Sequence, residues 1–243
     1  MCIRDIAYTQ NASDRGVLDI TATENKSGAG GLYEAVRDTT ATRSFSAVAD
    51  VTLDKALEPM GGTTLNVFGN QHNINGGGFS GFVTAAGQEL NFYNVGKLNE
   101  DGTVAASLKG FTGESTPLLN NAGTTGIYDT VIAGNSQTSL TTTFDGLIKN
   151  TGKLIISGSA IGAAGADNSN IANGIHSGII NNAEDAVLEI SASSFANNEI
   201  SMENTNDYGG VITNYGSVSV ANSVFGGQTA DSGNITSYPV SYT

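Results

Sequence analysis

Apolar and polar positions alternate in a pattern that recurs three times in the second half of the chain. A glycine opens each copy at positions 146, 178 and 210, so the period is 32 residues. A fixed period of this size is typical of a solenoid, because one repeat cannot bury its apolar face alone and must stack on the next. The three copies read Gly146-Leu-Ile-Lys-Asn150, Gly178-Ile-Ile-Asn-Asn182 and Gly210-Val-Ile-Thr-Asn214.

A second alternation follows each copy and predicts another strand of the same repeat. It contains an aliphatic pair with one residue between its members, and it closes on a large apolar residue. Together the two alternations give a repeat of two strands separated by turns. The apolar positions are Leu154, Ile156 and Ile161 in the first copy, Leu188, Ile190 and Phe195 in the second, and Val218, Val220 and Phe225 in the third.

Strand geometry assigns these positions to an inner and an outer side. Residues two apart on a strand share a face, so Ile148 and Asn150 point one way and Lys149 points the other. The corresponding columns are predicted to lie inside, where each buried amide needs the amide of the next repeat as its hydrogen-bond partner. The predicted ladder consists of Ile148, Ile180 and Ile212 with Asn150, Asn182 and Asn214.

The N-terminal region of the chain is expected to cover one end of the solenoid. Leu32, Ala35 and Val36 fall at helical spacing, which predicts a short helix near residues 31–38. An amphipathic helix suits this place because an open solenoid end exposes apolar side chains and unpaired strand edges.

The middle of the chain shows a weaker form of the repeat. An earlier copy is expected near residues 81–95, with Val83 in the place of Ile148 and Ala85 in the place of Asn150. Between about 96 and 140 the pattern degenerates, and we expect looser packing or loop insertions there. The chain is therefore divided into a cap region (1–44), the solenoid (45–235) and a tail (236–243), which we interpret as truncated from a longer chain.

Composition excludes some classes of function. The net charge is −13 and the isoelectric point about 4.3, so a nucleic-acid partner is not expected. Cys2 is the single cysteine, which excludes an intrachain disulfide. No apolar run has the length of a membrane-spanning helix.

Two short motifs carry a resemblance to a known family. Phe195-Ala-Asn-Asn198 is followed by Gly209-Gly-Val-Ile212, whereas Phe225 and Ile161 lack an asparagine three residues on. These residues resemble the polymorphic outer-membrane protein repeat, which pairs Phe-x-x-Asn with Gly-Gly-Ala and an aliphatic residue. The chain is thus similar to the passengers of autotransporter-type bacterial surface proteins. The repeat-motif residues are Phe195, Asn198, Gly209 and Gly210.

The resemblance implies an all-β fold, namely a right-handed parallel β-helix. It further implies an adhesin-like protein that is secreted or displayed at the cell surface, with a membrane anchor outside this sequence. The implied partner is a protein or glycan on a host or neighbouring cell.

Several side chains are weighed as candidate sites, and no cofactor or metal is predicted. His72 and His176 are far apart in sequence, and lone histidines usually serve local hydrogen bonds. Glu199, Glu203 and Asp207 could surround Ca²⁺, but their spacing matches no calcium loop, which favours a solvated acidic loop. Aromatic residues could stack on sugars but are more simply interpreted as packing. They are Phe82, Phe92, Tyr93, Tyr208, Tyr215 and Phe225.

Three functions remain in competition. The first is a non-enzymatic surface module, a rigid rod that presents loops to other cells. The second is a polysaccharide lyase or glycosidase, which needs paired carboxylates or a positioned base. The third is a self-assembling filament or phage-type spike, because an uncapped solenoid can stack end to end. The enzyme hypothesis would use residues from the weakly periodic region, namely Lys97, Lys109, Asp129 or Asp145.

Overall fold

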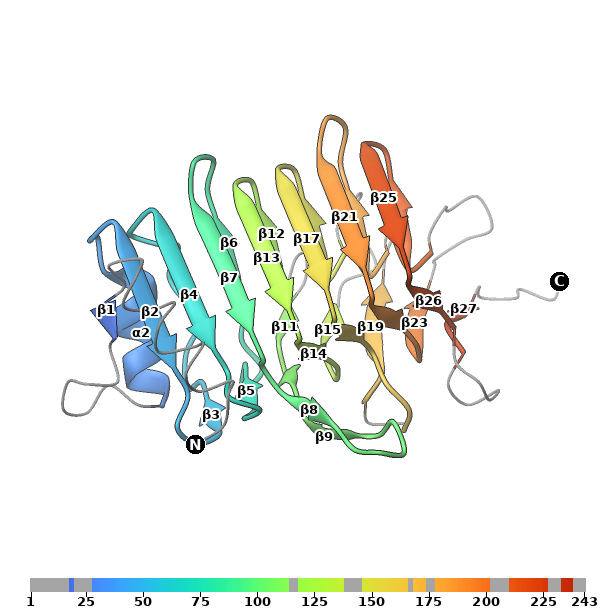
Figure 1. The fold of residues 1–243 in the computed structure, drawn as a ribbon, viewed down its shortest axis with the longest axis horizontal. Coiled ribbons are helices and arrows are strands. Elements are labelled where there is room, and N and C mark those ends of the chain that lie inside the picture. Colours follow the sequence, from blue (N-terminus) through green and yellow to red (C-terminus); the bar gives the residue numbers. More distant parts are fainter. Residues whose placement is uncertain are drawn as a thin grey trace, which may run out of the picture.

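The chain forms a parallel β-helix, shown as a computed structural model in Figure 1. The structure describes residues 18–19, 28–113, 118–137, 146–165, 168–173, 178–201, 210–226 and 233–237. A full coil contains four strands rather than the two predicted, and each strand belongs to a different face of the helix. We number these faces I to IV in the order in which the chain visits them.

Face II is the largest sheet, and its eight strands stack in sequence order from one end to the other. All neighbours in it are parallel, and residues at the same position of successive coils are paired, as in Leu154 with Leu188. Its strands are β1 (Leu18–Asp19), β2 (Thr42–Ser46), β4 (Thr64–Phe68), β7 (Glu89–Tyr93), β13 (Thr124–Tyr128), β17 (Lys153–Ser157), β21 (Val187–Ser191) and β25 (Ser217–Ala221).

Face III has seven short strands, each of which follows a face II strand from β2 onward, with the β8–β9 hairpin inserted between β7 and β10. Its strands are β3 (Val51–Thr52), β5 (Ile74–Asn75), β10 (Leu108–Lys109), β14 (Val131–Ile132), β18 (Ala160–Ile161), β22 (Ser194–Phe195) and β26 (Val224–Phe225).

Faces IV and I complete each coil, with five strands each. Face IV consists of β11 (Thr112–Gly113), β15 (Ser136–Gln137), β19 (Asn170–Asn173), β23 (Asn198–Ser201) and β27 (Ile235–Ser237). Face I consists of β6 (Phe82–Thr84), β12 (Leu119–Asn121), β16 (Ile148–Asn150), β20 (Ile180–Asn182) and β24 (Ile212–Asn214).

One continuous apolar core runs along the inside of the coils. The predicted inner residues Ile148 and Ile180 are fully buried, and Ile148 pairs with Ile180 as Ile180 pairs with Ile212. Each fully buried aliphatic side chain of this kind contributes roughly 1.5–3 kcal/mol through removal of apolar surface from water. The stacked core confirms the predicted inward orientation of the isoleucine column.

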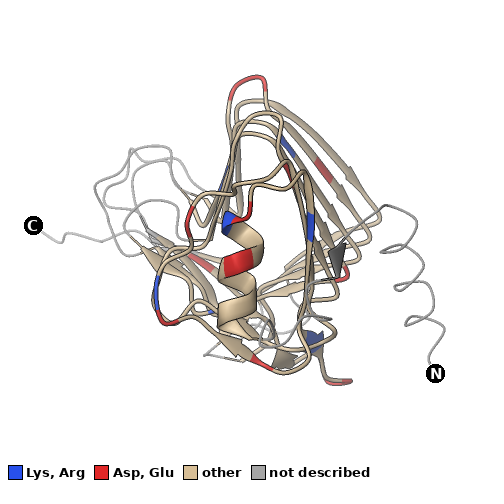
Figure 2. Cartoon of the chain, turned by 90° about the vertical axis from the view of Figure 1, so that its left-hand side faces the viewer, with Lys and Arg blue, Asp and Glu red and all other residues tan. Residues whose placement is uncertain are grey.

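A single described helix, α2 (Ala29–Arg37), covers the N-terminal end, as predicted. Figure 2 looks onto this end and shows the helix within the outline of the coils. Leu32, Ala35 and Val36 are buried and belong to the same core as the strands. The amphipathic spacing of these residues therefore directs one side of the helix into the first coils.

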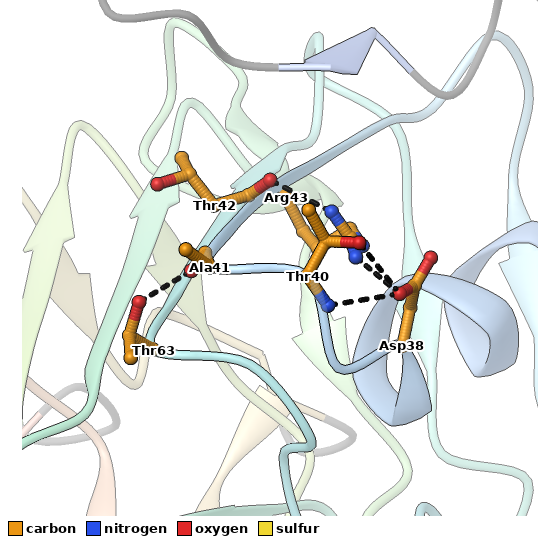
Figure 3. Close-up of polar contacts among 6 residues, drawn as sticks. All are labelled: Asp38, Thr40, Ala41, Thr42, Arg43 and Thr63. Carbon is orange, nitrogen blue, oxygen red and sulfur yellow. Dashed lines mark hydrogen bonds and ion pairs between the residues drawn. The ribbon is translucent and has the colours of Figure 1, made fainter.

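Polar contacts fix the C-terminal end of α2 to the first coils (Figure 3). The buried Arg43 guanidinium donates to the Asp38 carboxylate and, at 2.9 Å, to the Thr42 carbonyl. The Gly61 N–H donates to the Val36 carbonyl at 2.8 Å, and a Cβ at Gly61 would lie 2.2 Å from the Arg37 carbonyl oxygen. Only glycine permits so close an approach of the two backbones.

The expected register of the earlier copy was wrong by one residue. Phe82 rather than Val83 pairs in the column of Ile148, through Leu119, and Thr84 rather than Ala85 stands in the column of Asn150. A shift of one residue moves a side chain to the other face of a strand, which is why Val83 points outward.

The region from 96 to 140 differs from the prediction of loose packing. Strands β12, β13 and β14 form a regular coil, with Leu119, Ile127 and Ile132 each 1% exposed. The region also holds an insertion, a hairpin of β8 (Lys97–Leu98) and β9 (Val104–Ala106). It is the one antiparallel pair among the described strands.

Candidate functional site

The predicted asparagine ladder lies inside, at the corner between faces I and II. The Asn150 side-chain amide donates to the Asn182 carbonyl oxygen at 2.7 Å, and Asn182 donates to Asn214 at 2.7 Å. Asn121 extends the ladder upstream by donating to Asn150 at 2.7 Å. Asn150 and Asn182 are fully buried, whereas Asn214 is exposed on the last coil. The buried members of the ladder, Asn121, Asn150 and Asn182, are structural and offer no surface to a ligand.

A second asparagine ladder, which sequence reasoning missed, lies at the corner between faces III and IV. Asn135 donates to Asn170 at 3.1 Å, Asn170 to Asn198 at 3.1 Å, and Asn198 to Asn234 at 2.9 Å. The motif residue Asn198 is therefore a ladder member beneath the buried Phe195. Asn170 and Asn234 supply the amide that Ile161 and Phe225 lack three residues on.

Gly210 of the motif precedes β24. A Cβ at this position would meet only the Ile212 carbonyl oxygen, at an ordinary contact distance of 3.8 Å. Gly209 lies outside the described residues. The repeat motif thus contributes packing and a buried amide.

A third ladder, made of hydroxyl groups, lines the corner between faces II and III. The Thr130 N–H donates to Ser159 Oγ at 3.1 Å, the Ser159 N–H to Ser193 Oγ at 3.2 Å, and the Ser193 N–H to Ser223 Oγ at 3.2 Å. Each hydroxyl satisfies a backbone donor that the turn leaves without a strand partner. The signal was a Ser or Thr just before each face III strand from β14 to β26.

The outside of this same corner forms a groove. The inserted hairpin folds along the helix and packs Leu98 and Val104 against a small apolar cluster of Val131, Ala133 and Ala160. Thr103 also bridges to Ala164, in the coil that contains Ala160, and Figure 1 shows β8 and β9 running beside the later coils. The hollow between hairpin and corner, which we call the corner groove, has a volume of about 530 Å³.

Turn residues with left-handed backbone conformation form the edge of the corner groove. Asn94, Asp129, Gly158, Ala192 and Asn222 occupy the same turn position in five successive coils, with φ between 47° and 63°. Asn, Asp and Gly tolerate this conformation best. Because the chain turns from face II to face III once in every coil, the corner places one turn residue per coil along the groove.

Most polar side chains along the corner groove have no partner in the described part of the chain. Gln71, Asn94 and Asn222 contribute amides, and Lys97 and Asp129 contribute one charge of each sign. The hydroxyls of the third ladder lie beneath them and are already hydrogen-bonded. The groove therefore offers free amide donors and acceptors and little net charge.

The residues weighed for an enzyme are only partly brought together. Lys97 and Asp129 line the same groove, whereas Lys109 lies in β10 and pairs with Asn75. Asp145 lies outside the described residues. Among the described residues that line the groove, Asp129 is the one carboxylate.

Of the two histidines and the acidic loop, the structure describes only His72 and Glu199. His72 Nδ1 lies 3.5 Å from an Asp50 carboxylate oxygen, and the pKa of Asp50 is lowered mainly by hydrogen bonds from Asn73. His176, Glu203 and Asp207 lie outside the described residues, so of the weighed calcium ligands only Glu199 is described. Among described residues, no group of three or more His, Cys, Asp and Glu side chains could hold a metal.

Most of the aromatic candidates are packing residues. Phe82 and Phe92 are 2% and 1% exposed and meet edge to face in the core, with ring centroids 4.9 Å apart. Tyr93 points outward but stacks face to face between Phe68 and Tyr128, at 5.0 and 5.1 Å. A ring stacked on both faces presents only its edge to a ligand, and sugar recognition uses the face. Tyr208 lies outside the described residues.

A second hollow of about 520 Å³ lies on the outer side of face I. Lys149, Asn181, Glu184 and Tyr215 line it together with Ala183. Asn181 is 2% exposed although it belongs to the predicted outer column, and Lys149, Asn181 and Tyr215 all take part in further interactions. These side chains are occupied, which leaves the corner groove as the better candidate site.

Comparison with known proteins does not identify the function of this site. No protein-family model, curated protein or solved structure matches the chain. In the described part of the chain, no helix has the length and apolar character needed to cross a membrane.

Proposed function

We propose that this protein is a non-enzymatic, adhesin-like module, secreted or displayed at the cell surface, that binds a ligand on a host or neighbouring cell. The observation that carries the proposal is the corner groove. A regular solenoid needs no hairpin between β7 and β10. The hairpin of β8 and β9 nevertheless packs beside the coils and forms one wall of the corner groove. Binding sites are commonly carried by such insertions on a rigid scaffold.

The chemistry of the corner groove favours binding over turnover. Hydrolysis of a glycosidic bond normally needs two carboxyl groups at a fixed separation, and Asp129 has no second carboxylate among the described lining residues. The free amides suit hydrogen bonding to a ligand but are poor acids and bases.

Replacement of the hairpin tests the proposed function. Residues 97–106 are exchanged for a short Gly-Ser linker, and binding of the labelled protein to glycan and cell-surface protein arrays is compared with that of the parent. We expect array binding to fall at least tenfold while circular dichroism and the melting temperature stay close to the parent values. Unchanged binding, or turnover of any glycan by the parent protein, would overturn the proposal.

The alternative function is a polysaccharide lyase or glycosidase. It is favoured by one observation, that Lys97 and Asp129 line the same groove. In this case Lys97→Ala and Asp129→Ala would each abolish product formation on a polysaccharide panel. Product formation unaffected by both substitutions would remove this alternative.

A self-assembling filament or spike is favoured by the exposed apolar side chains of β25 and β26, where Val218, Val220 and Phe225 are 45%, 47% and 45% exposed. Sedimentation velocity at high protein concentration distinguishes this function, because a filament-forming protein gives species that grow with concentration.

A further inference from the structure

We infer that the corner groove binds a linear, uncharged glycan that lies parallel to the helix axis, with about one sugar residue on each coil. This inference names the ligand class of the binding function proposed above and rests on it. Four properties of the groove support it. They are its repeat, its polar groups, the small residues at its centre and a backbone whose N–H groups are already hydrogen-bonded.

The repeat of the corner groove is that of the coils. Its edge presents the same turn position five times, from Asn94 to Asn222. Neighbouring coils are about 4.8 Å apart, and a chain of β-linked pyranose rings advances by nearly the same length per ring. An extended peptide instead repeats its side-chain direction about every 6.8 Å, so it falls out of step with the coils. A glycan chain can therefore stay in register with the coils along the whole groove.

The polar groups of the corner groove suit hydroxyl groups. A carboxamide both donates and accepts, as a sugar hydroxyl does, and Gln71, Asn94 and Asn222 have no partner of their own in the described chain. The charges of Lys97 and Asp129 are opposite in sign, so the groove itself selects neither polyanions nor polycations. The net charge of −13 disfavours an anionic polymer further.

The residues at the centre of the corner groove have small or apolar side chains. Gly158 and Ala192 stand at the two turn positions between Asp129 and Asn222, and Leu98 of the hairpin faces the same hollow. Short side chains let a ring approach the backbone, and an aliphatic wall can contact the C–H face of a pyranose. The amides at the two ends of the groove can therefore bind the hydroxyl groups at ring edges. The small and aliphatic residues between them can contact ring faces.

The backbone of the corner is already hydrogen-bonded, which argues against a peptide strand as ligand. The N–H groups of Asn94, Asp129 and Gly158 each donate to a carbonyl of the next coil, at 2.9, 3.0 and 3.1 Å. A bound peptide strand needs a free sheet edge to pair with. Such a ligand would therefore find no backbone partner in the groove.

Length dependence of binding tests the inference directly. Isothermal titration calorimetry is performed with cellohexaose and cellotriose as neutral probes, with xylohexaose as a second neutral chain. Polygalacturonate serves as the polyanion and a random-sequence peptide library as the polypeptide. We expect each hexamer to bind at least tenfold more tightly than the trimer, and we expect no binding of polygalacturonate or peptides.

Two variants and a matched control locate the binding. Asn94→Ala and Asn222→Ala remove amides from opposite ends of the corner groove, and Asn120→Ala removes an exposed amide from the outer side of face I. The double variant Asn94→Ala/Asn222→Ala is expected to lose tenfold or more in affinity for the hexamer with little change for the trimer. Asn120→Ala should match the parent for both, and all variants should melt as the parent does.

The results separate this inference from the proposed function. Loss of a protein ligand on hairpin replacement, with no neutral glycan bound, would overturn the glycan inference and leave the binding module standing. Cleavage of the bound hexamer would overturn the non-enzymatic function and leave the ligand class standing. Hexamer binding that is equal in the parent and the double variant would overturn the placement of the glycan in the groove.

Discussion

The two ends of the β-helix bury the same kinds of side chain to very different extents. At the N-terminal end Phe45 is fully buried beneath α2, whereas at the C-terminal end Phe225 is 45% exposed. One coil inside the C-terminal end, Phe195 stacks on Phe225 with ring centroids 4.5 Å apart and is fully buried. The comparison teaches that a coil does not bury its own core residues, because its neighbour on each side does so.

Polar groups at the two ends follow the same rule. In the column of the first asparagine ladder, the first face I strand, β6, carries Thr84, whose hydroxyl contacts Met60 Sδ at 3.9 Å inside the core. At the other end the Asn214 amide donates only within its own turn, to the Gly216 carbonyl at 3.0 Å. The upstream end of the ladder is thus closed by a smaller side chain, and the downstream end reaches the surface.

Truncation of stacked phenylalanines tests this comparison with the largest expected effect. Phe195→Ala removes a fully buried ring and leaves a cavity between two coils, which should lower the free energy of unfolding by about 3–5 kcal/mol. Phe225→Ala removes the half-exposed ring of the same column and should cost less than about 2 kcal/mol. Urea unfolding followed by circular dichroism measures both. Equal losses would show that the last coil is covered in solution.

The asparagine ladder offers a second, smaller test. Asn182→Ala removes one of the two acceptors of the buried Asn150 amide and breaks the bond to Asn214, so we expect a loss of about 2–3 kcal/mol. Asn214→Ala removes the bond from Asn182 and the bond to Gly216, but at an exposed position where water can replace them, so it should cost only about 0.5–1 kcal/mol. The same unfolding experiment measures the difference. A cost of Asn214→Ala as large as that of Asn182→Ala would contradict the nearest-neighbour account.

The sequence predicted those features that keep a constant spacing. Ile148, Ile180 and Ile212 recur every 32 residues together with their asparagines, and both columns lie where the alternation placed them. The second asparagine ladder escaped because a variable loop precedes it. Asn198 follows Phe195 by three residues, whereas Asn234 follows Phe225 by nine. A loop changes the spacing in sequence without changing the register in space.

The register error and the corner groove have different causes. The earlier copy was aligned on Gly81, but in the structure Gly81 precedes Phe82 directly while Gly146 stands two residues before Ile148. The groove depends on how the hairpin of β8 and β9 folds back onto Val131 and Ala160, far along the chain. Local pattern carries no information about such a contact, so sequence reasoning found Lys97 and Asp129 as candidates without finding the site between them.

The smallest expected effect concerns the ion pair that fastens the N-terminal cover. The hydrogen bond from Arg43 holds the pKa of the Asp38 carboxyl down to about 2, below its ordinary value of 3.8. A lowered pKa means that the contribution to stability is complete above about pH 4 and is lost as the pH falls toward 2. Asp38 is half exposed, so solvent screening keeps the effect modest.

This pH effect is expected to be confined to the N-terminal end, because the ion pair of Asp38 and Arg43 lies there. Acidification from pH 4.5 to 2.5 should lower the hydrogen-exchange protection factors of the α2 amides, such as those of Leu32 and Val36, relative to those of β21. Asp38→Asn should lower α2 protection at pH 4.5 already and remove its change between the two pH values. Equal loss of protection in α2 and β21 would instead indicate global acid unfolding. Because Arg43 stays buried and charged when Asp38 is protonated, the cover is expected to loosen before the coils separate.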